Sequence, residues 1–445
     1  MIKFFSFFTI LIFCFSCSLD DKSGIWSKTQ KVEKEKKISK KNLKKELFAD
    51  EKAIKKEFNI NLRIKLKAKP VRPTFTNKLD NNIGRIDYNG DLKKISKFKF
   101  SKIKNFYQAE SDLVFDEDNI IFFEKKGTIL KFNSSSKLIW KKNYYTKREK
   151  KLHPFLFFAN NRKTLIVADN IAKYYALNIK TGDLLWSKSN SSSFNSQIKI
   201  YKDKFFVIDF ENILRCYSLK NGNEIWNIKT DKSFIKSQKK LSLIIMSDKI
   251  YFSNSLGDIS AVDIDTGNLV WQTPTQITSV YEDNFFLKTS DLIGHESSIL
   301  FSNNNNEFFS LDAASGVLNW KQRVNSNVRP IIIDNLIFTV SVEGFLTIIN
   351  NRNGNILRTT DLFEKFTVKL LLEKEKTRAK FKPKGFVVGT ENIYLTTDEG
   401  RLFIIDILTG KTKDIMRIDR ESISRPFVLD QNLFIIKDNA IVKLN

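Results

Sequence analysis

The sequence predicts an all-β fold, an eight-bladed β-propeller with four antiparallel strands in each blade. Two observations lead to this prediction. A hairpin motif, in which a turn glycine is followed four residues later by a tryptophan, recurs along the chain at intervals of 38 to 56 residues. Short β-rich runs, such as residues 164–169, 204–210 and 336–341, precede the hairpins with the same period. Four short strands repeating every 40–50 residues or so are typical of a propeller blade.

The hairpin motif is clearest at residues 261–273, AVDIDTGNLVWQT. Its glycine provides the positive φ of a tight turn, and the Asp or Asn before it can accept hydrogen bonds from the turn backbone. The tryptophan is expected to pack against the adjacent blade. The glycine and tryptophan positions are therefore predicted to pack the blades and not to catalyse. These residues are Trp140, Gly182, Trp186, Gly222, Trp226, Gly267, Trp271, Gly316, Trp320, Gly354 and Gly410.

Three copies depart from this hairpin motif. Ser136 stands at the glycine position of the first copy, and the copies at Gly354 and Gly410 lack the tryptophan, which puts their packing in question. The blade count comes from the third strand of each repeat. These strands are predicted to end near residues 133, 179, 219, 264, 313, 350, 407 and 444, which gives eight blades.

The eighth blade is predicted to take its fourth strand from the N-terminal side. Its third strand, residues 440–445, is followed by no hairpin partner, and an open ring would expose strand edges. Residues 91–100 lie before the first blade and carry Ile95, Phe98 and Phe100 among lysines. We expect this segment to pair with the last strand and close the ring.

Residues 1–16 have the pattern of a secretory signal peptide. Lys3 precedes an apolar run, residues 4–16, that is shorter than the roughly 20 residues of a membrane span. Ser16 and Cys17 resemble a bacterial lipobox, although Cys14 stands where leucine is usual. Cys17 is therefore the predicted lipid attachment site, with an uncleaved anchor as the alternative. Because Ser18 is not the aspartate of an inner-membrane retention signal, the expected location is the periplasmic face of the outer membrane.

A basic tether is predicted to follow the signal peptide, over residues 17–73. Residues 22–70 contain 17 Lys and Arg against 6 Asp and Glu, in a chain of net charge +25. Leu43, Leu47, Ile54 and Phe58 are spaced for one helix face, so the tether is expected to be partly helical or disordered. No nucleic-acid recognition motif accompanies the charge. The predicted domains are thus 1–16, 17–73 and a propeller over 74–445.

The sequence offers no catalytic, cofactor-binding or metal-binding set. Cys216 lies in an apolar strand, where a small buried hydrophobe is the simplest interpretation. His153 and His295 are far apart and are expected in different blades. None of the hydrolase, zinc-protease or phosphate-loop motifs occurs. We therefore expect a protein without enzymatic activity and without a cofactor.

The pattern A-x-D-x-x-T-G-x-x-x-W at residues 261–271 resembles the repeat of pyrroloquinoline-quinone-type propellers. With eight blades, a lipobox-like leader and a tether, the chain is similar to BamB-type lipoproteins over about residues 70–445. This resemblance implies a non-catalytic scaffold of the outer-membrane β-barrel assembly (BAM) complex. Its expected partners are the periplasmic domains of BamA, other BAM subunits and nascent outer membrane proteins.

Two alternatives to the scaffold remain open. A quinoprotein dehydrogenase would imply bound calcium, a quinone and usually a vicinal cysteine pair, and the chain has no adjacent cysteines. A different periplasmic binding module on the same propeller is the other alternative. The insertion at residues 363–384 is either a mobile loop or an arm that contacts a partner.

Overall fold

In a computed structural model of the protein, residues Ala53–Asn445 form one compact unit. The structure describes residues 56–72, 78–103, 112–230, 237, 239–275, 289–303, 306–364, 367–369, 376–378 and 381–445. The predicted signal peptide, Cys17 and most of the predicted tether lie outside these residues. In the described part of the chain, no helix has the length and hydrophobicity needed to cross a bilayer.

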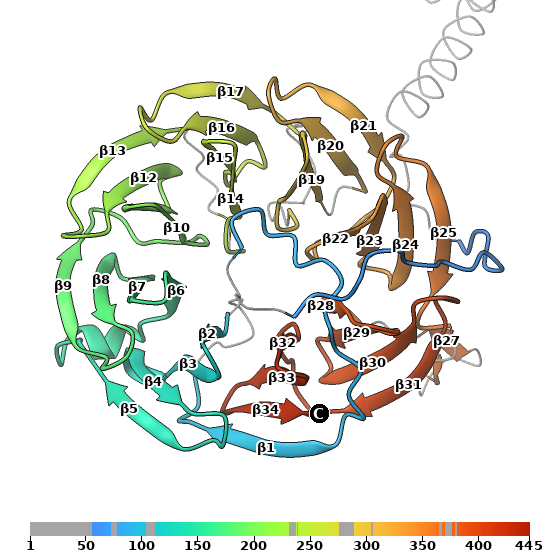
Figure 1. Cartoon of the computed structure of the whole chain (residues 1–445), viewed down its shortest axis with the longest axis horizontal. Helices are drawn as coiled ribbons and strands as arrows, with labels where there is room; N and C mark the ends of the chain where they lie inside the picture. Colours follow the sequence, from blue (N-terminus) through green and yellow to red (C-terminus); the bar gives the residue numbers. More distant parts are fainter. Residues whose placement is uncertain are drawn as a thin grey trace, which may run out of the picture. The chain divides into compact units, whose positions relative to one another are not determined.

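Eight four-stranded antiparallel sheets are arranged as blades around a ring (Figure 1), which confirms the predicted eight-bladed propeller. The third strands end within one residue of the predicted positions. In seven blades the strands follow one another from the centre outwards. Blade 1 contains β2 (Val114–Asp116), β3 (Asn119–Glu124), β4 (Thr128–Phe132) and β5 (Leu138–Lys142). Blade 2 contains β6 (Leu156–Asn160), β7 (Thr164–Asp169), β8 (Lys173–Asn178) and β9 (Leu184–Ser189).

The next five blades repeat this order. Blade 3 contains β10 (Lys199–Tyr201), β11 (Lys204–Ile208), β12 (Ile213–Ser218) and β13 (Glu224–Lys229), and blade 4 contains β14 (Leu243–Met246), β15 (Lys249–Ser253), β16 (Ile259–Asp263) and β17 (Leu269–Thr273). Blade 5 contains β18 (Ile293–His295), β19 (Ser298–Ser302), β20 (Phe308–Asp312) and β21 (Leu318–Gln322). Blade 6 contains β22 (Ile331–Ile333), β23 (Leu336–Val340), β24 (Phe345–Asn350) and β25 (Ile356–Asp361), and blade 7 contains β28 (Pro383–Val388), β29 (Asn392–Thr397), β30 (Arg401–Asp406) and β31 (Thr412–Arg417).

Blade 8 combines the two ends of the propeller, as predicted. It contains β32 (Phe427–Leu429), β33 (Asn432–Lys437), β34 (Ala440–Leu444) and, as its outermost strand, β1 (Lys94–Lys99). β1 pairs antiparallel with β34, with Phe98 opposite Ile441 (Figure 1). Phe98 is fully buried, and its ring centroid lies 5.6 Å from that of Phe132 in blade 1. The pairing therefore completes blade 8, and the contact of Phe98 with Phe132 joins it to blade 1.

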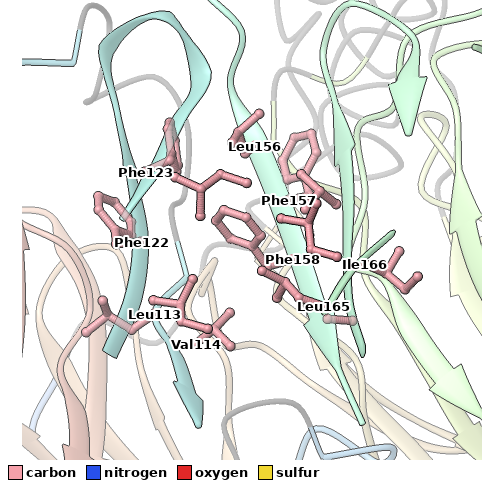
Figure 2. Packing of buried hydrophobic residues seen from close by; sticks show 14 of the residues in the cluster. Leu113, Val114, Phe122, Phe123, Leu156, Phe157, Phe158, Leu165 and Ile166 are labelled. Atoms are coloured by element: carbon pink, nitrogen blue, oxygen red, sulfur yellow. The ribbon is translucent and has the colours of Figure 1, made fainter. Parts of the chain in front are cut away.

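The core lies between neighbouring blades. Middle strands such as β7 and β11 are buried along almost their whole length because each is covered by a blade on both sides. Figure 2 shows this packing between blades 1 and 2, where Phe123 of β3 faces Phe158 of β6 with ring centroids 6.0 Å apart. Outermost strands such as β9 instead alternate between exposed and half-buried residues. The burial gradient explains why the middle strands are continuous apolar runs.

Residues 56–72 pack against the propeller, although the sequence analysis assigned them to the tether. Phe58, expected on a helix face, forms an isolated antiparallel bridge with Thr359 of β25. Ile64 N donates to Leu408 O over 2.9 Å. The physical reason is an alternation of apolar and polar, mostly basic, residues from 60 to 69, the period of an extended strand with one buried face. Its inward-facing side chains, Leu62, Ile64, Leu66 and Ala68, pack on the core of blades 6 and 7.

Residues 78–93 then cross the ends of the innermost strands of several blades. Ile245 N donates to Leu79 O over 2.9 Å, and Gly294 N donates to Asp80 O over 2.8 Å. Further along, Ile86 N donates to Val388 O over 2.8 Å. These contacts reach blades 4, 5 and 7 at the face where the innermost strands end. We call this face the strap face and the opposite one, where each blade begins, the connection face.

Ring closure by β1 yields a test. Phe98→Ala should lower the free energy of unfolding by about 3–5 kcal/mol, because it leaves a cavity between the first and last blades. Lys99→Ala, on the same strand but exposed, should change it by less than about 0.5 kcal/mol. Urea unfolding followed by far-ultraviolet circular dichroism measures both. Equal stability of the two variants would contradict a closing role for β1.

Candidate functional site

The sequence-predicted glycines and tryptophans meet at the junctions between blades. Each tryptophan lies over the turn glycine of the following blade, so a Cβ added at Gly267 would stand 2.7 Å from the Trp226 ring. Gly267 has φ +75°, a conformation that side chains other than glycine adopt only with strain. The same pairing joins Trp140 to Gly182, Trp186 to Gly222, Trp271 to Gly316 and Trp320 to Gly354. Glycine is thus required for two reasons: the backbone has positive φ, and the tryptophan ring leaves no room for a Cβ.

Each junction also contains a hydrogen bond between blades. Trp226 Nε1 donates to Ile264 O over 3.1 Å, and Trp271 Nε1 donates to Ala313 O over 3.1 Å. In both cases the acceptor stands three residues before the covered glycine. Trp186 and Trp320 make the equivalent bonds to Leu219 O and Asn351 O. The indole therefore satisfies a turn carbonyl while its ring packs over the turn glycine.

The first junction replaces this hydrogen bond by a buried ion pair. Lys131 Nζ lies 2.6 Å from Asp116 Oδ2, with both side chains almost fully buried. It also donates to Ile179 O over 3.0 Å, the carbonyl that corresponds to the indole acceptor elsewhere. Trp140 Nε1 consequently has no partner among the described residues. In blade 1, Trp140 thus makes the aromatic contact with the turn glycine, and Lys131 makes the hydrogen bond to the turn carbonyl.

Arg358 takes the tryptophan position in blade 6, where the sequence analysis left packing in question. It is fully buried, and its Nη2 would stand 2.7 Å from a Cβ added at Gly410. Nη2 donates to Ile407 O over 3.1 Å, which is again three residues before the glycine. Nη1 donates to Leu62 O over 3.0 Å. Arg358 therefore closes the junction and also holds the N-terminal segment.

The junction between blades 7 and 8 contains no tryptophan. Asp414 occupies the tryptophan position of blade 7 and is exposed. The neighbouring blade 8 carries β1 outside β34 and has no glycine turn at the corresponding position. The absence of tryptophan from this copy therefore follows from the ring closure.

A charged pocket lies at the connection face, where the chain enters the innermost strands. It is lined by residues of blades 1, 2, 3, 4, 6 and 8, including Asp112, Gln197, Lys240, Arg329 and Arg425. Asp112 pairs with Lys240, and its Oδ1 lies 2.6 Å from Arg425 Nη2. Arg329 Nε donates to Asp291 Oδ2 over 2.7 Å. Ion pairs between blades therefore surround the centre of the propeller.

These pairs perturb the pKa values of their members. Burial alone would raise the pKa of Asp112, but Lys240 and Arg425 outweigh it and hold this pKa well below the usual range. Burial would likewise raise the pKa of Asp291, and Arg329 lowers it. Burial lowers the pKa of Arg329, and the positive charge of Arg425 adds to that effect. Both carboxylates thus stay ionised as partners of the buried cations.

This pocket does not fit the calcium site that a quinoprotein would need. Ca²⁺ binds six to eight oxygen ligands, most of them carboxylate or carbonyl oxygens. Here the carboxylates already pair with Lys240, Arg329 and Arg425, whose charges would repel a cation. Among the described residues there is no cluster of three or more His, Cys, Asp and Glu side chains placed to hold a metal ion.

The other singled-out residues lie apart from one another. His153 precedes β6 of blade 2, and His295 ends β18 of blade 5. Cys216 is buried in β12, where burial raises the pKa of its thiol to about 12. Of the insertion at residues 363–384, the structure describes a short hairpin of β26 (Thr367–Lys369) and β27 (Lys376–Arg378). Phe363 and Phe381 hold its base with ring centroids 5.2 Å apart.

Sequence reasoning missed three features: Arg358, the central ion pairs and the segment at residues 56–93. The alternation at residues 60–69 could have revealed part of the segment. Arg358 could have been found by aligning the copies, because it stands four residues after Gly354. The ion pairs join residues as far apart in the sequence as Asp112 and Arg425, and no local sequence pattern predicts such pairs.

Eight four-stranded blades, with glycine–tryptophan contacts at five of their junctions, define a propeller of the pyrroloquinoline-quinone repeat class. Within this class, the model of the family described as outer membrane protein assembly factor BamB matches residues 125–360, more than half of the chain. The chain therefore belongs to the BamB family. The matched residues run from the residue that follows β3 in blade 1 to the second-last residue of β25 in blade 6.

Curated relatives agree with this family at low identity. BamB of Moranella endobia is 21% identical over 246 residues, which cover 54% of this chain and 61% of the relative. BamB of Legionella pneumophila is 23% identical over 36% of this chain and 35% of the relative. BamB of Shewanella oneidensis is 25% identical over 33% and 35%, respectively. The matches thus span less than two thirds of these relatives.

Solved structures share the fold. BamB from Moraxella catarrhalis has a TM-score of 0.63 at 14% identity, covering 80% of this chain and 99% of that chain. Quinohemoprotein alcohol dehydrogenase from Comamonas testosteroni has a TM-score of 0.61 at 10% identity, covering 85% and 81%. At such identities the likeness concerns architecture alone, because one fold carries unrelated functions.

The blade junctions yield a test with an internal control. Gly267→Ala should lower the free energy of unfolding by about 3 kcal/mol, because the new methyl group meets Trp226 in addition to the strain of positive φ. Gly84→Ala has φ +64° and no atom within 4 Å of the added Cβ, so it should cost about 1 kcal/mol. Urea unfolding separates the two. Equal losses would show that the ring contact contributes nothing.

Proposed function

We propose that the protein is a non-catalytic scaffold lipoprotein of the outer-membrane β-barrel assembly complex, which docks on BamA. The observation that carries the proposal is the BamB family match across blades 1 to 6. The relatives are described as outer membrane protein assembly factors, which supports a location at the outer membrane. A dehydrogenase is the weaker alternative, because the central pocket pairs its carboxylates with three cations instead of presenting them to calcium.

The outermost strands offer a contact mode for such docking. β5, β9, β13, β17 and β21 form the outer edges of their sheets, and an outer edge can accept a strand from a partner. Each of these strands exposes apolar side chains beside the edge. They are Leu138, Ile139, Leu184, Leu185, Ile225, Leu269, Val270 and Leu318. An extended partner strand would gain backbone hydrogen bonds at the edge and bury these side chains.

Crosslinking in native membranes tests this docking. A photoreactive amino acid at Leu185, on the edge of β9 and 54% exposed, should form an adduct that mass spectrometry identifies as BamA. Leu152 is the control, because it is 62% exposed but lies in the connection before β6. Adducts without BamA at Leu185, or equal BamA yields at both positions, would argue against docking by the outer edge. The same experiment on a chain lacking residues 367–378, the hairpin of β26 and β27, asks whether the insertion contributes, and it leaves the buried Phe363 and Phe381 and all of β28 in place.

Membrane attachment through Cys17 is part of the proposal. Metabolic labelling with a fatty-acid probe should mark the full chain, and Cys17→Ala should abolish the label because the acyl acceptor is gone. Cys14→Ala is the matched control and should leave labelling intact if cleavage occurs after Ser16. Continued labelling of the Cys17 variant would exclude this residue as the acylation site.

A further inference from the structure

The N-terminal segment presents a row of cations on the outside of the propeller. Arg63, Lys65, Lys67 and Lys69 are all exposed, whereas the residues between them face the core of blades 6 and 7. Successive side chains on one face of an extended strand stand about 6.6 Å apart, so the row is about 20 Å long. Among the described residues, none of the four takes part in an ion pair. The row is therefore a concentrated positive patch.

Backbone contacts hold this row in place. Lys67 N donates to Asp334 Oδ2 over 2.8 Å, and Asp334 belongs to the turn after β22 on the strap face. Arg358, itself fully buried, donates to Leu62 O at the start of the row. The segment is thus fixed by its backbone and its inward side chains. The cationic side chains remain available for another surface.

Exposed apolar side chains flank the cations. Phe58 is 53% exposed, Ile60 41% and Val71 61%. An aromatic and two aliphatic residues at the ends of a Lys- and Arg-rich stretch match the composition of segments that lie in a membrane interface. The apolar residues enter the headgroup region while the cations meet lipid phosphates.

The sequence on the N-terminal side points to the same partner. The row ends a stretch, residues 22–70, with 17 Lys and Arg against 6 Asp and Glu, and that stretch leads back to the predicted lipid attachment site. A chain anchored there would keep the row close to the bilayer. A secretory signal peptide would deliver the protein to the periplasm. There, an anionic membrane surface is an extended polyanion that the row can contact.

We propose that the segment at residues 56–72 docks the strap face of the propeller on an anionic phospholipid surface, with Arg63, Lys65, Lys67 and Lys69 on the lipid phosphates. The docking orients the ring: the strap face turns towards the membrane, and the connection face, with the insertion at residues 363–384, turns away from it. It is independent of whether the partner is BamA.

Fluorescence quenching by brominated acyl chains tests this orientation in the full chain. A dye is attached at Val71→Cys, beside the row, or at Leu152→Cys on the connection side, and the two native residues are 61% and 62% exposed. Cys14 and Cys17 are changed to serine in every chain used, so that the dye reports only the introduced cysteine and no acyl group anchors the protein. The chain without an introduced cysteine measures background labelling, and buried Cys216 should not react. With phosphatidylglycerol vesicles, quenching at position 71 should exceed that at 152 at least threefold. With phosphatidylcholine vesicles, the two positions should become equal.

Charge variants show whether the row causes the docking. The fourfold variant R63Q, K65Q, K67Q and K69Q should lower partitioning into phosphatidylglycerol vesicles by on the order of 100-fold. K147Q, R148Q, K150Q and K151Q remove the same charge from the connection before β6 and should leave partitioning unchanged. Raising the salt concentration should abolish quenching at position 71 in a chain that keeps Arg63, Lys65, Lys67 and Lys69. This second measurement needs no charge variant.

Three results would overturn the proposal. One is equal quenching at positions 71 and 152 in phosphatidylglycerol vesicles. Another is unchanged partitioning of the R63Q, K65Q, K67Q and K69Q variant. The third is tighter binding of single-stranded DNA than of vesicles at equal phosphate concentration, which would assign the row to nucleic acid instead.

Discussion

The packing of one side chain over one glycine determines how each of blades 1 to 6 meets the next. A turn at φ near +70° brings its backbone so close to the neighbouring outer strand that no Cβ fits between them. The tryptophan fills this junction and donates to a carbonyl that would otherwise be buried without a partner. Because the contact is made between blades, it holds the outermost strand of one blade against the turn of the next. The rest of the structure depends on this repeated geometry.

The exceptions to this contact are informative about the ring. Lys131 and Arg358 each donate to the same turn carbonyl that an indole satisfies elsewhere. At blade 6 a guanidinium is the better group, because its additional N–H groups also reach Leu62 O of the N-terminal segment. Where β1 closes the ring, the turn is absent and the contact is not needed. The two copies without tryptophan therefore each have a physical reason in the neighbouring structure.

The two faces of the propeller differ in chemistry. The strap face is covered by residues 78–93, which hydrogen-bond to the innermost strands of blades 4, 5 and 7. The connection face holds the paired charges around Asp112, Asp291 and Arg329. This arrangement ties the blades together on one face by backbone bonds and on the other by ion pairs. The rim is left partly exposed, as the alternating burial of β9 shows.

The sequence by itself determined the repeat: the strands, the turns, the count of eight blades and the closure by residues 91–100, because these rest on local periodicity. It also contained the alternation at residues 60–69, but the lysine-rich composition of this stretch led to its prediction as a tether. Only the tertiary structure decided which side chain covers which glycine, that Arg358 replaces a tryptophan, and that Asp112 meets Arg425. Those contacts join residues from 34 to 313 positions apart. Their partners are set by the blade angles, which no local pattern encodes.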